Sequence, residues 1–117
     1  MLRLFRATRN SWNGLLAAAR SEEAFRQELI VFAVALPLAY FIAIDVWRWV
    51  AMIGVLLVIM IAELLNTAVE KLSDHVTPQT HPAIGRIKDM ASAAVGLSLL
   101  LAGLIWAAVL AERFGLL

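Results

Sequence analysis

The stretch MASAAVGLSLLLAGLIWAAVLA, residues 90–111, decides the fold, because it contains 22 residues without a charged side chain. A helix rises about 1.5 Å per residue and the hydrocarbon core of a bilayer is about 30 Å thick, so about 20 apolar residues span it. The stretch therefore predicts a transmembrane helix, which we place at residues 87–112.

Two further apolar runs precede it, at residues 29–44 and 50–62. Each is too short to span a bilayer in its strictly apolar form. They reach the required length if the first helix includes residues of the preceding FRQE and the second continues as a helix through Glu63 and Asn66. On this basis we expect transmembrane helices at residues 28–46 and 48–72.

The composition agrees with an all-α membrane protein and excludes several other classes. The 117 residues are 62% hydrophobic and 16% charged, with a mean hydropathy of +0.84, which is too apolar for an ordinary soluble domain of this size. A net charge of +1 argues against a nucleic-acid partner. There is no cysteine for a thiolate metal site, and neither a phosphate-binding loop nor a dinucleotide motif. The length fits a single domain, residues 1–117.

Residues 2–20 have the pattern of an amphipathic helix that lies on the membrane surface. Apolar side chains such as Phe5 and Trp12 recur at helical spacing, and arginines fall largely elsewhere on the helix. Residues 73–86 contain two prolines, a glycine and several polar residues, which predicts a loop.

The distribution of basic residues predicts the orientation. With a cytoplasmic N-terminus, eight of the ten Lys and Arg residues lie inside, and only Arg48 and Arg113 lie outside. This asymmetry fits the positive-inside rule, so the loop at residues 73–86 is expected in the cytoplasm.

Glu63, Asn66 and Glu70 have i, i+3, i+7 spacing and share one face of the second predicted span. Ionisable groups inside a membrane cost about 2.5 to 3.5 kcal/mol on insertion scales, so they are usually functional. A carboxylate drawn out of water suits a proton acceptor, which favours Glu63 as a general base. Glu70, about 10 Å further along the axis, is better placed for a hard cation. The alternative is a polar face that joins helices, for which Asn66 alone would suffice.

The stretch SEEAFRQE, residues 21–28, brings three more carboxylates to the start of the first span. Carboxylates from two helix ends can share a Mg²⁺ that also holds phosphates. The alternative is helix-start chemistry, with Ser21 as the N-cap and acids in the first turn. Glu23 fits that alternative better, and both readings stay open for Glu22 and Glu28.

The stretch GRIKDMASAAVG, residues 85–96, opens the third span. Lys88 and its basic neighbour Arg86 could extend to the headgroups or hold phosphate. Ser92 and Gly96 form a small-xxx-small pair, which is typical of close helix contact. His81 fits a loop residue, or a nucleotide contact beside Lys88 and Asp89.

The segments FRQE, AELLNTAVEKLSD and RIKDMASAAV, with three spans and an amphipathic N-terminal helix, closely resemble the small bacterial integral-membrane diacylglycerol kinases. The resemblance covers nearly the whole chain, and E-x-x-N-x-x-x-E followed by K-D-x-x-S-A-A-V is a specific combination. It implies a homotrimeric helix bundle in the bacterial inner membrane, with active sites shared between subunits and facing the cytoplasm. It also implies that ATP and Mg²⁺ are used to phosphorylate diacylglycerol to phosphatidic acid, a step of phospholipid metabolism.

The resemblance also assigns roles to individual residues. Glu63 corresponds to the general base beside the lipid hydroxyl, and Glu22 and Glu70 correspond to the metal carboxylates. Asn66 and Lys88 match catalytic motif residues, and Lys88 and Asp89 match residues that line the nucleotide. Further positions correspond to ones near ATP (Arg3, Asn10, His81) or near the lipid (Arg3, Trp12, Glu28, Ser92). Glu22 thereby becomes the metal candidate and Glu28 a supporting residue.

Two departures and three rival interpretations accompany this assignment. Asn10 stands where family members carry a tyrosine and Gln79 where an acid is usual, so the adenine side is less well defined. More loosely related members phosphorylate undecaprenol. A proton-coupled carrier could use Glu63, but it has no use for the acids and Lys88 at the cytoplasmic rim. A silent assembly protein would use only the small-residue third helix.

Overall fold

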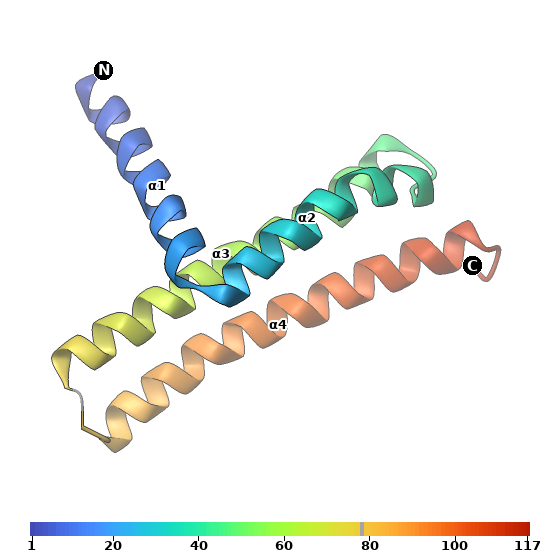
Figure 1. The fold of residues 1–117 in the computed structure, drawn as a ribbon. Coiled ribbons are helices and arrows are strands. Elements are labelled where there is room, and N and C mark those ends of the chain that lie inside the picture. Colours follow the sequence, from blue (N-terminus) through green and yellow to red (C-terminus); the bar gives the residue numbers. More distant parts are fainter. Residues whose placement is uncertain (78) are drawn as a thin grey trace.

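The computed structural model describes residues 1–77 and 79–117, and within them it contains four helices and no strand. These are α1 (Leu2–Ser21), α2 (Glu23–Ile42), α3 (Val46–Val76) and α4 (Pro82–Arg113). Helices α2, α3 and α4 form a bundle in which α3 runs antiparallel to α2 and α4, and α1 leaves the bundle at the start of α2 (Figure 1). In the described residues, α2, α3 and α4 are long and apolar enough to cross a membrane. The predicted all-helical membrane class with an additional N-terminal helix is therefore confirmed.

Helix α2 begins earlier and ends earlier than the expected span of 28–46. A single extended residue, Glu22, separates α1 from α2, so the acidic residues that follow it belong to the helix. At the other end the backbone becomes extended at Ala43. Asp45 then starts α3 two residues before the expected position 48, because its Oδ1 accepts the N–H of Arg48 at 2.9 Å.

The loop expected at residues 73–86 is shorter in the structure. Helix α3 continues to Val76, and α4 begins at Pro82 rather than at residue 87. Proline is favoured in a first helical turn, where its missing N–H costs nothing, and the ring nitrogen of His81 accepts the Ala83 N–H at 3.1 Å. Part of the expected loop, residue 78, lies outside the described residues.

Two tryptophans hold the bundle together through indole N–H bonds to backbone carbonyls. Trp106 of α4 donates to Met52 of α3, and Trp49 of α3 donates to Leu36 of α2, both at 3.0 Å. Leu36 precedes Pro37, which lies inside α2 and has no N–H to donate to the carbonyl four residues before it. Trp47 is 75% exposed, as a residue at the membrane interface would be.

Ionic contacts close the end of the bundle that contains the α2–α3 turn. The guanidinium of Arg48 donates to both carboxylate oxygens of Glu112 in α4, and to Asp45 at 2.7 Å. A two-point arginine–carboxylate contact fixes orientation as well as distance. This end of α4 is therefore tied to the start of α3.

The lengths of α3 and α4 position the other end relative to the membrane. Helix α3 has 31 residues and is therefore about 46 Å long, more than the 30 Å of a hydrocarbon core. Counting about 20 residues from Val46 places the second boundary near residue 66. On this count we expect Glu63 just inside the hydrocarbon and Glu70 just outside it. The last turns of α3 and the first turns of α4 extend beyond the start of α2 (Figure 1).

The packing at the start of α2 can be tested at Phe25. Its side chain is only 1% exposed, whereas that of Phe41 on the same helix is 71% exposed. We predict that Phe25→Ala lowers the free energy of unfolding by about 3 kcal/mol, since it leaves a cavity at the α1–α2 corner. The measurement is equilibrium unfolding in detergent, with Phe41→Ala as the matched control. Equal losses in the two variants would contradict the packing.

Candidate active site

Acidic side chains gather where the α1–α2 corner meets the middle of α3. Glu22 comes from the corner, Glu28 from α2, and Glu63 and Glu70 from α3. The carboxylates of the other three all lie close enough to Glu63 to interact with its charge. We call these four residues the carboxylate cluster. Like charges within this range repel one another, so a cation or a hydrogen-bond donor beside them stabilises the arrangement.

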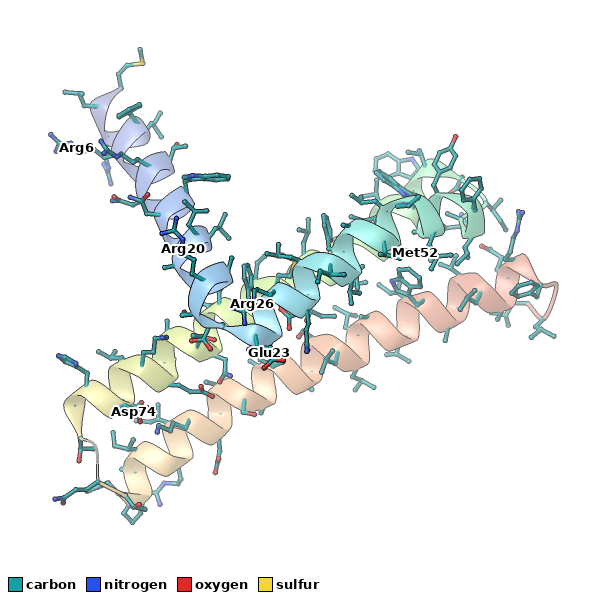
Figure 2. The ribbon with its side chains drawn as sticks, viewed as in Figure 1. Arg6, Arg20, Glu23, Arg26, Met52 and Asp74 are labelled. Carbon is teal, nitrogen blue, oxygen red and sulfur yellow. The ribbon has the colours of Figure 1, made fainter. Side chains whose placement is uncertain are left out.

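The corner is fixed by backbone bonds. The Glu22 N–H donates to the Ala18 carbonyl at 2.8 Å, and the Glu22 carbonyl accepts the Arg26 N–H at 3.2 Å. The Arg26 guanidinium donates to the carbonyls of Ala19 and Arg20, each at 3.0 Å. Figure 2 shows Arg26 and Glu23 at this corner, below the end of α1 that carries Arg20. Arg26 thus satisfies carbonyls that the end of α1 leaves free, and Glu22 is held against α3.

In the described part of the chain, two buried oxygens of the site have no hydrogen-bond donor, whereas two other oxygens do have partners. Asn66 donates its Nδ2 to Glu70 Oε1 at 3.2 Å, and Lys71 Nζ lies 3.1 Å from Glu22 Oε1. The Oε1 atom of Glu28 and the Oδ1 atom of Asn66 are buried and find no hydrogen-bond partner within the described residues. A buried acceptor without a partner costs about 1 to 3 kcal/mol. The site therefore favours a ligand that brings a donor or a cation.

The donor set fits a magnesium ion that arrives with phosphates. In residues 1–77 and 79–117, no group of three or more His, Cys, Asp or Glu side chains is arranged so that it could hold a metal ion. Mg²⁺ is usually bound by one or two carboxylates together with phosphate and water oxygens. Glu22 and Glu70 could supply the two carboxylates, and a nucleotide would have to supply the phosphates.

Lys88, Asp89 and Ser92 come from α4, which lies beside the Glu70 end of the cluster. Lys88 Nζ is 2.5 Å from Asp74 Oδ1, and Asp74 comes four residues after Glu70, which is about 6 Å along the α3 axis. Asp89 and Ser92 are exposed, and His81 caps α4. The roles assigned to these residues stay predictions, and they require the nucleotide to extend toward the end of α3.

The three α1 residues named by the resemblance are distant from the cluster in one chain. Helix α1 points away from the bundle, and Figure 2 shows Arg6 near its outer end. Arg3, Asn10 and Trp12 precede Glu22 by 19, 12 and 10 residues, which correspond to about 28, 18 and 15 Å of helix. Their roles stay predictions, and a neighbouring subunit is the simplest way to bring them to an active site.

Sequence reasoning missed two residues near the site. Lys71 was counted only as a positive charge, yet it pairs with Glu22 across the corner. Nothing in the spacing indicates this pair, because it depends on how α3 packs. Asp74, which holds Lys88, carried a usable signal: it lies 11 residues after Glu63, about three helical turns, on nearly the same face.

A groove between α1 and α3 is lined at one end by Lys71, which pairs with Glu22 of the cluster. It has a volume of about 580 Å³ and runs from Ser11 to Lys71. Its walls are mainly small or apolar side chains, including Leu15 and Leu64. The groove therefore joins an apolar surface to the polar site.

Comparison with known proteins gives a consistent result. Residues 9–110 match the model of the family described as prokaryotic diacylglycerol kinase. The diacylglycerol kinase of Escherichia coli (strain K12) is 37% identical over 113 residues, which are 97% of this chain and 93% of that protein. The diacylglycerol kinase of Pseudomonas aeruginosa is 39% identical, over 92% of this chain and 88% of that protein. The Haemophilus influenzae diacylglycerol kinase is 36% identical, with 92% and 91% coverage.

Proposed function

The chain belongs to the prokaryotic diacylglycerol kinase family and has a diacylglycerol kinase function, and we propose that its carboxylate cluster is the catalytic centre. In this proposal, the γ-phosphoryl group of ATP is transferred to the free hydroxyl of diacylglycerol, which gives phosphatidic acid and ADP. The observation that carries the proposal is the meeting of Glu22, Glu28, Glu63 and Glu70 at the expected inner boundary of the hydrocarbon. A lipid hydroxyl and a water-soluble triphosphate can both reach that level.

Glu63 is proposed as the general base. Its carboxylate takes the proton of the lipid hydroxyl while the hydroxyl oxygen forms a bond to the γ-phosphorus. The bond between the γ-phosphorus and the oxygen that bridges it to the β-phosphate breaks, and that oxygen leaves with ADP. The position of Glu63 just inside the hydrocarbon supports this role, because the acceptor hydroxyl need not leave the membrane.

Glu22 and Glu70 are proposed to hold Mg²⁺, which would offset the charge of the triphosphate when bound. Asn66 holds Glu70 through the 3.2 Å bond from its Nδ2 and thereby orients that carboxylate. The buried Oε1 of Glu28 could accept a hydrogen bond from the glycerol part of the lipid. Lys88 and Asp89 are proposed to contact the nucleotide further toward the end of α3.

A homotrimer with shared sites is part of the proposal. Ser92, Ala93 and Gly96 are exposed on α4, and a Cβ added at Gly96 would meet no atom within 4 Å. The chain's own packing therefore does not explain these small residues, whereas a helix of another subunit would. A neighbour could also bring the distant α1 residues to the cluster.

The proposed location is the bacterial inner membrane, with the N-terminus and the active site in the cytoplasm. The excess of basic residues at the cluster end of the helices supports this orientation. The amphipathic α1 would then lie on the cytoplasmic surface, and the exposed indole of Trp12 would face the lipid.

The test of the function is a phosphorylation assay with labelled ATP and Mg²⁺, in which purified protein receives diacylglycerol or undecaprenol in mixed micelles. We expect labelled phosphatidic acid as the main product. Preferential labelling of undecaprenol would move the protein to the other substrate class. No transfer to either lipid, with proton flux in vesicles that needs no ATP, would support a carrier.

Glu63→Gln tests the base. Because the amide cannot accept the hydroxyl proton, we predict a fall in kcat of about 10²- to 10⁴-fold with little change in nucleotide affinity. The measurements are steady-state kinetics and binding of a non-hydrolysable ATP analogue. Glu23→Gln, on the same side of the membrane but outside the cluster, is the matched control. A Glu63→Gln enzyme with nearly normal turnover would remove the base assignment.

Glu70→Gln tests the metal carboxylate. Loss of a hydrogen bond that supports a metal ligand lowers metal affinity by roughly tenfold. Removal of the ligand itself should lower it by at least as much. We therefore predict that half-maximal activity requires about tenfold more Mg²⁺, as measured by titration at fixed ATP. An unchanged Mg²⁺ requirement would take Glu70 off the list of ligands.

A further inference from the structure

Lys71 is the cation that pairs with the carboxylate cluster in the described part of the chain. Its Nζ lies 3.1 Å from Oε1 of Glu22, the corner residue proposed to hold the metal. Arg26, four residues after Glu22, donates to the carbonyls of Ala19 and Arg20 instead. The ammonium of Lys71 thus contacts a carboxylate oxygen of Glu22 to which a metal ion would also bind.

The two partners differ in how firmly they are held. The side chain of Glu22 is 30% exposed, and its backbone is fixed between α1 and α2 by the bonds to Ala18 and Arg26. The side chain of Lys71 is 62% exposed and has four rotatable methylene groups. Lys71 can therefore swing into water at little cost, whereas Glu22 must stay at the corner.

We propose that Lys71 is a displaceable counter-ion of the site: it holds Glu22 against α3 in the metal-free protein and leaves when the divalent cation binds. The inference rests on the proposed function, since it takes Glu22 as a metal ligand. Lys71 is a positioning residue, because it acts through Glu22 and contacts neither lipid nor nucleotide in this role. The ion pair lowers the repulsion among the carboxylates. Because a metal ion that binds Glu22 must displace Lys71, the pair also weakens metal binding.

The experiment measures Mn²⁺ binding to the full-length protein in detergent, by the loss of the free Mn²⁺ signal in electron paramagnetic resonance. Lys71→Gln removes the competing charge, so Mn²⁺ should bind more tightly by about 1.5- to 5-fold, the range expected for an exposed ion pair. Lys71→Arg keeps a cation on Glu22 and should bind Mn²⁺ no more tightly than the wild type. No nucleotide, lipid or turnover is needed.

Arg20→Gln is the matched control for general electrostatics. Arg20 is an exposed residue at the end of α1, near the corner, and its removal changes the net charge by the same amount. A direct pair predicts a clear gain in Lys71→Gln and a smaller one in Arg20→Gln. Equal gains would show a long-range field effect and overturn the proposal.

Two further outcomes separate this inference from the proposed function. If Glu22→Gln weakens Mn²⁺ binding but Lys71→Gln leaves it unchanged, the metal assignment stands and the counter-ion role falls. If Glu22→Gln has no effect on Mn²⁺ binding, the metal assignment itself fails and the inference fails with it. Thermal unfolding without metal gives the second readout, since Lys71→Gln should melt at a lower temperature and gain more from added Mn²⁺. Lower stability with unchanged Mn²⁺ affinity would leave Lys71 a purely structural role.

Discussion

The repulsion among carboxylates at the edge of the hydrocarbon is the constraint on which the rest of the structure depends. Glu63 lies on a helix that otherwise suits lipid, and three further acids approach it from the corner, α2 and α3. Such a group is stable only beside cations, hydrogen-bond donors or water. The corner at Glu22, the overhang of α3 and the nearby lysine all serve to bring those partners to one level of the membrane.

The two ends of the bundle differ in how completely their charged groups are paired. At the end with the α2–α3 turn, Arg48 satisfies Asp45 and Glu112, and the contact leaves little for a ligand to do. At the other end, acids exceed the cations that touch them, and buried oxygens on Glu28 and Asn66 have no partner within the described residues. Polar groups that are all paired stabilise the fold, whereas unpaired polar groups favour the binding of a ligand. This contrast supports the proposal that the chemistry takes place at the cluster end.

The sequence allowed the fold class and the α3 face of the site to be predicted, because both depend on local periodicity. A run of 22 uncharged residues can hardly be anything but a membrane span, and i, i+3, i+7 spacing places Glu63, Asn66 and Glu70 together. The start of α2 and the Lys71–Glu22 pair could not be predicted, because they arise from tertiary packing at the corner. The approach of Arg3 or Asn10 to a site depends on a second subunit, which the periodicity of one chain does not describe.

The most direct measurement is a structure of the protein in a lipid bilayer with Mg²⁺ and a non-hydrolysable ATP analogue. We expect a metal ion about 2.0 to 2.1 Å from carboxylate oxygens of Glu22 and Glu70, with Lys71 released from Glu22. Glu63 should then face the γ-phosphate from the lipid side. A nucleotide bound elsewhere, with these carboxylates turned away from both metal and phosphate, would contradict the account.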